Sequence, residues 1–318
     1  MTAVPGIHHV TAIAGDPQAN VDFYGGVLGL RLVKRTVNFD DPTTYHLYFG
    51  DRDGRPGTIL TFFPWPGAPR GLRGAGQATA TAFAVPARSL AYWADRLAEG
   101  GLEFERPEAR FGEQVLALDD PDGLRLELIG RDLATPAGPR DGGDVPVEHA
   151  IRGLAGVTLT ERGAAATEAL LTSLLGFRRA ACEGTRTRLE ADGREPGAVV
   201  DLVASADGPA GRIAVGTVHH VAFRARDDAE QLTWRADLLA AGFAVSPVKD
   251  RNYFRSIYFR EPGGVLFEVA TDGPGFAADE APATLGNTLA LPPWLEPRRR
   301  ELEAALPPLS VRPGRCAA

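Results

Sequence analysis

Two pairs of adjacent histidines are the residues of this chain best suited to chemistry. His8-His9 opens the apolar run HHVTAIAG, and His219-His220 opens the similar run HHVAFRAR. The chain has only 6 histidines, so four of them stand in two matching contexts. Neutral imidazole is the commonest side-chain ligand of transition metals. We therefore expect one histidine of each pair to bind a metal ion.

A buried carboxylate completes a candidate metal-binding set. Glu268 stands in the middle of GGVLFEVA, an apolar stretch typical of a buried strand. Because an unpaired buried carboxylate is costly, a ligand role explains this residue better than a structural one. Two histidines and one carboxylate form the facial set that leaves coordination positions open on non-haem Fe(II).

The composition indicates a globular protein of about two domains. The chain has 318 residues, of which 44% are hydrophobic and 24% charged. A net charge of −7 argues against a nucleic-acid partner or an anionic membrane surface. No signal-peptide pattern follows Met1, and no apolar run is long enough to span a membrane. Cys182 and Cys316 cannot form a disulfide framework, so we expect a cytoplasmic protein.

The elements that must position these residues recur four times as a strand, a helix and three strands. Unit 1 runs from IHHVTAIA through the helical PQANVDFYGGVLGL to the strand GTILTFFP. Unit 4 repeats this order from HHVAFRA through the helical DAEQLTWRADLLAAG and the strand FAVSPV to VLFEVA. Units 2 and 3 occupy about 77–130 and 152–203. The predicted fold class is therefore α+β, built from four βαβββ units.

The segment at 131–149 is rich in Pro, Gly and Asp and is typical of a linker. We expect a first domain at 1–130 with units 1 and 2, and a second at 150–273 with units 3 and 4. A tail at 274–318 follows. One unit cannot cover its own sheet, so units must pair and curl around a shared cleft.

The candidate ligands are unevenly distributed over the units. Alignment on the turn glycine before the last strand places at equivalent positions Thr61, Glu127, Asp201 and Glu268. If unit 1 faces unit 4, the site collects a histidine of unit 1 together with His220 and Glu268. If units pair within each half, the set becomes Asp201, His220 and Glu268. We favour the first arrangement, because the HHV strand otherwise has no purpose.

Side-chain direction distinguishes the two histidines of each pair. Neighbours on a regular strand point to opposite faces, so one histidine should face the cleft and the other should not. His9 is in phase with Thr11, whereas the first histidine of each pair is in phase with a valine that suits the helix side. Unless the strands are irregular, His9 and His220 are therefore the expected ligands, with His8 and His219 near the rim of the site.

Four further ionisable residues are expected to have no part in the metal site. His46 in TYHLYF and His149 in VEHA are expected to be structural. Glu127 and Asp201 have no histidine in their own units, so we do not expect a second metal site there.

Three stretches resemble the ring-cleaving dioxygenases specific for para-hydroquinones, within the vicinal-oxygen-chelate superfamily. They are HHVT, VKRTVNFDDPTTYHLYFGDRDGRPGTILTFFP and RNYFRSIYFREPGGVLFEVA, and the likeness covers nearly the whole chain. The resemblance implies two glyoxalase-like (vicinal oxygen chelate) domains. It also implies Fe(II) bound by His9, His220 and Glu268, with O₂ as co-substrate. Mn(II) is the alternative ion, because it binds similar nitrogen and oxygen sites.

The resemblance also implies roles for residues around the metal, namely His8, Thr11, His219, Arg251 and Tyr258. Tyr258 would hydrogen-bond a metal-bound phenolate, and Arg251 would stabilise developing negative charge or hold the acid-base partner. His219 would donate and accept protons, because an imidazole titrates near neutral pH. The implied substrate is a small aromatic hydroquinone.

Two other function classes are compatible with the predicted fold. A glyoxalase-like lyase or isomerase would use another divalent ion, but Thr61 cannot supply the second carboxylate that glyoxalase I typically needs. A metal-free binding protein of the resistance type would lack the His/His/Glu set. The catechol dioxygenases take a histidine from the third unit, where RGLAGVTLTE has none. The sequence leaves a homo-oligomer open, since four units complete the site without dimerisation.

Overall fold

Two curled eight-stranded sheets form the protein, whose computed structural model describes residues 3–132, 143–192 and 196–311. The strands of the first sheet are β1 (Ile7–Ala14), β2 (Arg31–Asn38), β3 (Asp41–Gly50), β4 (Ile59–Pro64), β13 (Thr217–Ala225), β14 (Lys249–Asp250), β15 (Arg255–Arg260) and β16 (Leu266–Thr271). The strands of the second sheet are β5 (Gln77–Val85), β6 (Glu108–Arg110), β7 (Glu113–Asp119), β8 (Arg125–Gly130), β9 (Leu154–Glu161), β10 (Arg178–Glu183), β11 (Arg186–Glu190) and β12 (Val199–Ala204).

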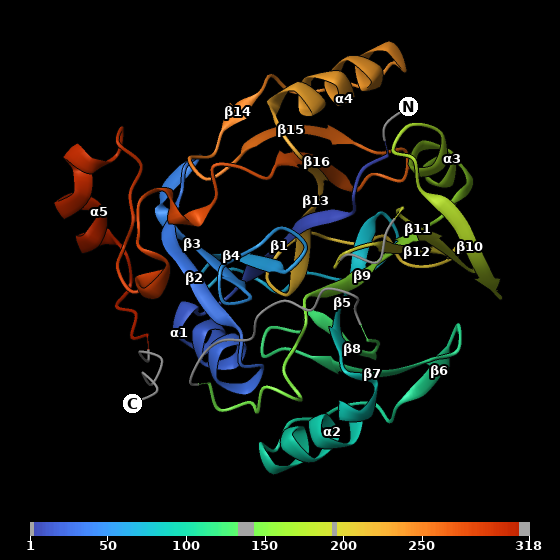
Figure 1. Ribbon diagram of the computed structural model, residues 1–318, viewed down its shortest axis with the longest axis horizontal. Coiled ribbons are helices and arrows are strands. Elements are labelled where there is room, and N and C mark those ends of the chain that lie inside the picture. Colours follow the sequence, from blue (N-terminus) through green and yellow to red (C-terminus); the bar gives the residue numbers. More distant parts are fainter. Residues whose placement is uncertain (1–2, 133–142, 193–195, 312–318) are drawn as a thin grey trace.

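The helices are short and lie on the outside of the sheets (Figure 1). They are α1 (Pro17–Val21), α2 (Leu90–Glu99), α3 (Ala165–Ser173), α4 (Asp228–Ala240) and α5 (Arg299–Ala305), with a π-helix at Asp22–Val27 and 3-10 turns at Ala87–Ser89, Phe276–Ala278, Pro282–Thr284 and Glu296–Arg298. α4 packs against β13, β15 and β16, and buries Trp234 and Leu238. Among the described residues, none of the helices combines the length and apolar character needed to cross a membrane.

Each sheet joins units from the two halves of the chain. The strand orders are β14-β15-β16-β13-β1-β4-β3-β2 and β10-β11-β12-β9-β5-β8-β7-β6. Unit 1 thus pairs with unit 4 and unit 2 with unit 3, which Figure 1 shows as blue beside orange and teal beside yellow-green. The favoured pairing of units is confirmed, and the alternative ligand set with Asp201 is wrong. The domain limits stay a prediction, and residues 133–142 of the linker lie outside the described residues.

The central strand pairs carry β-bulges at matching places. Along β1 and β13 the register runs from Ile7↔Phe223 to His9↔Ala222, and from Thr11↔His220 to Ala12↔Val218. His8 and His219 are therefore the extra residues of two bulges. The β5–β9 pair has the same two irregularities. Because a bulge interrupts the alternation of faces, adjacent side chains no longer need to point apart. The regular alternation assumed from the sequence does not hold here.

Two elements differ from the sequence prediction. The stretch 243–248 is not a strand, although Ser246 N donates to Tyr258 O at 2.9 Å. Pro247 has no N–H to continue a ladder, so only Lys249–Asp250 pairs with β15. The first helix is also shorter and less regular than predicted, since it becomes a π-helix at Asp22 and ends at Val27.

The C-terminal segment packs along the first sheet near β2 and β3 (Figure 1). Lys34 of β2 is fully buried, and its Nζ lies 2.5 Å from Asp279 Oδ1 and also contacts Glu280. A small hydrophobic cluster that includes Tyr48, Tyr253 and Phe276 joins this segment to the sheet. The segment therefore supports the sheet that carries the histidine pairs.

Candidate metal centre

Three buried side chains converge where β1 pairs with β13. His9 Nε2 lies 3.3 Å from His220 Nε2. Glu268 Oε2 lies 2.9 Å from His220 Nε2 and 3.5 Å from His9 Nε2. A ligand atom from each of the three residues lies within 4.8 Å of the others. The structure thus brings together the three ligands predicted from the sequence.

The donor atoms suit a metal ion. Glu268 Oε2 is buried and has no hydrogen-bond partner of acceptable geometry within the described residues. Each candidate ligand histidine uses its Nδ1 for a contact with the preceding histidine, at 2.9 Å for His9 and 2.8 Å for His220. This leaves both Nε2 atoms to face the carboxylate oxygen. Neutral imidazole nitrogens and an ionised carboxylate are the forms that metal binding requires.

His8 and His219 lie behind the ligand histidines. A metal-binding histidine commonly donates its second ring N–H to an acceptor, and Nδ1 of the preceding histidine is within reach in each pair. Burial, and then the charge of His9, lowers the pKa of His8 well below its ordinary value. Burial, and then the charge of His220, lowers the pKa of His219 to about 3. Burial thus favours the neutral form of both imidazoles, and the proton-transfer role of His219 stays a prediction.

Ser256 orients the Glu268 carboxylate. Ser256 Oγ donates a short hydrogen bond to Glu268 Oε1, which leaves Oε2 toward the histidines. Burial by itself would raise the pKa of Glu268, but the charge of His9 and the contact with His220 lower it well below its ordinary value. The carboxylate therefore stays ionised. Sequence reasoning missed Ser256; its place two residues before Tyr258 was the available signal.

Tyr258 and Arg251 lie together beside His220. The rings of Tyr258 and His220 are 5.9 Å apart between centroids. Arg251 Nε donates to Tyr258 Oη at 3.1 Å, and Arg251 Nη2 donates to Asp40 Oδ2 at 2.8 Å. Burial, and then the charge of Glu268, raises the pKa of Tyr258, so the phenol keeps its proton. Asp40, in the turn between β2 and β3, is a further residue that sequence reasoning missed.

Thr11 connects the centre to a histidine that was expected to be structural. Thr11 is the register partner of His220, and its Oγ1 lies 3.1 Å from Thr61 Oγ1. Thr61 Oγ1 in turn lies 2.7 Å from His46 Nε2. Burial, and then the charge of His9, lowers the pKa of His46 well below its ordinary value. His46 thus belongs to the surroundings of the centre, whereas His149 lies elsewhere, against Ser89.

The second sheet has the same architecture without metal-binding side chains at its centre. The register positions of His9 and His220 are taken there by Gly156 and Ala80. Glu127 accepts two hydrogen bonds from Arg110, at 2.8 and 2.9 Å. Asp201 accepts two from Arg188, at 2.8 and 3.0 Å. Arginine therefore neutralises both carboxylates, and no second metal-binding group is found within the described residues.

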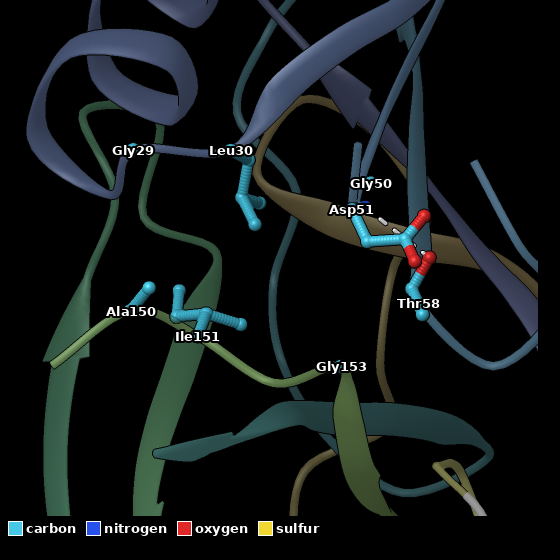
Figure 2. A pocket seen from close by; sticks show the side chains of 8 residues that line it. All are labelled: Gly29, Leu30, Gly50, Asp51, Thr58, Ala150, Ile151 and Gly153. Carbon is cyan, nitrogen blue, oxygen red and sulfur yellow. Dashed lines mark hydrogen bonds between the residues drawn. The ribbon is translucent and has the colours of Figure 1, made fainter. Parts of the chain in front are cut away.

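Two pockets lie away from the candidate centre. Figure 2 shows one between Gly29, the β3–β4 turn and the segment at 150–153, with Asp51 as its acidic residue. Asp51 Oδ2 already accepts a hydrogen bond from Arg55 at 2.7 Å. The other pocket lies along α4, around Trp234. Because neither is lined by a residue of the candidate centre, the buried His/His/Glu group remains the site best equipped for chemistry.

Comparison with known proteins agrees with this fold and site. The model of the glyoxalase/bleomycin resistance protein/dioxygenase superfamily matches residues 6–128 and 153–269. The chain belongs to this superfamily. The solved structure of glyoxalase I from Zea mays superposes with a TM-score of 0.61 at 15% identity, over 84% of this chain and 92% of that one. This likeness concerns the fold alone, and the predicted α+β fold with glyoxalase-like domains is confirmed.

Nearer relatives in the superfamily bear dioxygenase names. A Bacillus subtilis (strain 168) protein with the provisional name ring-cleaving dioxygenase MhqO is 49% identical over 307 residues, 96% of this chain and 97% of its own. The chlorohydroquinone/hydroquinone 1,2-dioxygenase of Sphingobium indicum is 35% identical over 94% of this chain and 95% of its own. A solved Bacillus subtilis structure, provisionally a dioxygenase, has a TM-score of 0.94 at 47% identity, covering 98% and 99%. By this kinship the chain is an enzyme of the ring-cleaving dioxygenase type.

Proposed function

We propose that the protein is an Fe(II)-dependent dioxygenase that opens the ring of para-hydroquinones with O₂. The observation that carries the proposal is the convergence of His9, His220 and Glu268. Glu268 Oε2, which faces the two histidines, has no hydrogen-bond partner within the described residues. The similarity to a hydroquinone 1,2-dioxygenase supports the substrate class. When bound, Fe(II) supplies the electron transfer between a phenolate and O₂ for which protein side chains are not suited. Mn(II) is the alternative ion.

The side chains around the centre are suited to a ligand that binds through a single oxygen. A para-hydroquinone has no adjacent hydroxyl group, so it would be bound through a single deprotonated oxygen. Tyr258 Oη accepts from Arg251 and so keeps its own hydrogen free to donate to that oxygen. Arg251 remains a cation held between Tyr258 and Asp40. A donor aimed at an oxyanion, with a cation behind it, stabilises negative charge in a buried site.

The remaining predicted residues would act on the ligand set and on the substrate. His8 and His219 would fix the ring orientation of His9 and His220 through their Nδ1 contacts. Because His219 is neutral, any proton transfer through it would begin from the neutral imidazole. Phe254, whose ring centroid lies 5.2 Å from those of His8 and His9, would help to exclude water from one side. The proposal includes a small aromatic substrate and a cytoplasmic location.

The decisive experiment is O₂ consumption by the protein loaded anaerobically with Fe(II). Hydroquinone, methylhydroquinone and catechol are compared side by side. We expect uptake with the hydroquinones, loss of uptake in His220→Ala, and retention in His149→Ala, whose ring contacts Ser89 and not the centre. No uptake with any of the three, despite bound iron, would move the assignment to a lyase or to a binding protein.

A further inference from the structure

The two sides of the metal centre are built alike but carry different residues. On β15 and β16, Tyr258 is the register partner of Glu268. On β3 and β4, Tyr48 is the register partner of Thr61. Thr61 and Glu268 are each the fourth residue after the turn glycine of their units. Thr61 therefore occupies, on the unit 1 side, the place that the carboxylate ligand has on the unit 4 side.

A chain of hydrogen bonds leads across the unit 1 side to the centre. Tyr48 Oη lies 2.8 Å from His46 Nδ1, and His46 Nε2 lies 2.7 Å from Thr61 Oγ1. Thr61 Oγ1 lies 3.1 Å from Thr11 Oγ1, on the strand that carries His9. Tyr48 is 1% exposed, and Thr61 and Thr11 are 0% exposed. The hydroxyl groups of this chain are thus shielded from solvent.

The chain can run in two directions, which differ in whether Tyr48 or Thr11 keeps an unshared hydroxyl hydrogen. A neutral imidazole has one donor and one acceptor nitrogen. Tyr48 packs in a hydrophobic cluster and has only His46 Nδ1 as an acceptor within the described residues, so we infer the direction in which Tyr48 donates to His46. The Nε2–H of His46 then donates to Thr61, and Thr61 donates to Thr11. This order leaves the hydroxyl hydrogen of Thr11 available to the centre.

We propose that Thr61, His46 and Tyr48 are positioning residues that hold the Thr11 hydroxyl as a donor to the charged oxygen of a phenolate at the metal centre. The inference rests on the proposed function, because it requires a phenolate ligand. A hydrogen bond to an ionised oxygen is roughly twice as strong as a neutral one, and a chain of donors polarises its last member. A carboxylate in place of Thr61 would instead repel the phenolate.

The test measures phenolate binding without turnover. The full chain is loaded with redox-inert Zn(II) and titrated with 4-nitrophenol, whose absorbance reports its ionisation. We expect Thr61→Val to weaken nitrophenolate binding roughly tenfold and to raise the pKa of the bound phenol. Thr61→Ser should restore both. Tyr48→Phe should shift both in the same direction by less.

A matched control lies on the same strand. Tyr45→Phe removes a hydroxyl that donates to Pro307 O, outside the chain of donors, and should change neither quantity. If Thr61→Val fails to fold, the test is the comparison of nitrophenolate binding by Tyr48→Phe, which loses a donor of the chain, with binding by Tyr45→Phe, which does not. Binding that is equal in wild type, Thr61→Val and Tyr48→Phe overturns this inference alone. Absence of nitrophenolate binding to the zinc-loaded wild type overturns both the inference and the phenolate site of the proposed function.

Discussion

Ser256 is the residue through which the orientation of Glu268 can be changed without removing a ligand. Its hydroxyl donates to Glu268 Oε1 and leaves Oε2 toward the two histidines. Loss of a hydrogen-bond partner of this kind typically weakens metal binding by about 10- to 100-fold. We expect that loss for Ser256→Ala, measured by competition for Zn(II) with a chromophoric chelator. Ser173→Ala, at an exposed position on α3, should keep the wild-type affinity. Equal affinities would show that packing alone holds the carboxylate.

Glu161 predicts a pH dependence of stability. Burial, and then the charge of Glu261, raises the pKa of Glu161 to about 7. Both of its carboxylate oxygens lack a hydrogen-bond partner within the described residues. Because the folded protein holds this proton more tightly than the unfolded chain, the stabilisation is complete below the unfolded pKa of about 4.5 and is lost as the pH rises through 7. The slope reaches at most ~1.4 kcal/mol per pH unit.

Urea unfolding at several pH values checks this expectation. Glu161→Gln cannot ionise, so it should lack this contribution to the slope between pH 4.5 and 7 and be more stable than wild type at pH 8. Glu99→Gln, at an exposed position, should follow wild type throughout. A Glu161→Gln curve parallel to that of wild type would contradict the raised pKa.

Single residues also show where prediction from the sequence succeeds and where it stops. His9, His220 and Glu268 could be selected because their types are unusual in apolar strands, and types are visible in a sequence. The alignment of turn glycines placed Thr61 opposite Glu268, but the hydrogen bonds of Thr61 and Ser256 could not be predicted, because they depend on the register between neighbouring strands. His46 was expected to be structural for the same reason, since no local pattern places it beside Thr61.

At the scale of elements, the bulges at His8 and His219 explain why both histidines of each pair belong to the centre. A regular strand would send one of them to the helix side. The bulges arise from the pairing of β1 with β13, two strands far apart in the sequence, so no local sequence pattern reveals them. The strand prediction at 243–248 fails for a related reason. Its apolar residues suggested a strand, but Pro247 prevents continuous pairing.

The turn glycines that aligned the four units give a prediction for these elements. Gly57 and Gly123 both have positive φ, at 84° and 91°. An added Cβ at Gly57 would lie 2.7 Å from Pro196 O, whereas at Gly123 the nearest atom is 3.8 Å away. Gly123→Ala should therefore cost about 1–2 kcal/mol, for the backbone alone. Gly57→Ala should cost a further 1–3 kcal/mol or so, because backbone must shift.

Free energies of unfolding in urea separate the two contributions. Gly57 also joins the sheets, since its N–H donates to His8 O and its carbonyl accepts from Leu154 N, each at 2.8 Å. The larger loss in Gly57→Ala should therefore be accompanied by weaker Zn(II) binding, which Gly123→Ala should not show. Equal losses in the two variants would mean that the close approach to Pro196 relaxes freely.

At the scale of the whole molecule, two sheets of similar topology differ in the side chains at their centres. The first sheet takes its strands from the beginning and the end of the chain (Figure 1), so the candidate metal ligands come from units 1 and 4. The second sheet, from the middle, has glycine and alanine at the histidine positions, and its buried carboxylates Glu127 and Asp201 are paired with arginine. The pairing of units could be predicted by asking which units hold histidines. The arginine pairs could not, since Arg110 and Arg188 lie on strands whose register no motif reveals.

This division predicts opposite outcomes for two buried substitutions. Arg188→Met leaves Asp201, which is 3% exposed, with only the 3.3 Å contact from Arg186, and should cost up to about 3–5 kcal/mol of unfolding free energy. Its Zn(II) affinity should stay at the wild-type value. Glu268→Gln should largely abolish Zn(II) binding. Glu268→Gln should destabilise the metal-free protein less than Arg188→Met does, because the buried Glu268 Oε2 has no hydrogen bond to lose within the described residues.

Metal titration and urea unfolding of the metal-free proteins measure both quantities. Arg178→Met is the control, since Arg178 is 69% exposed and its ion pair with Glu190 should contribute less than about 1 kcal/mol. If Arg188→Met weakened Zn(II) binding as much as Glu268→Gln, the two sheets would be coupled, and the second would share in the function of the first. If it changed stability alone, the second sheet would be the support on which the metal-binding sheet is held.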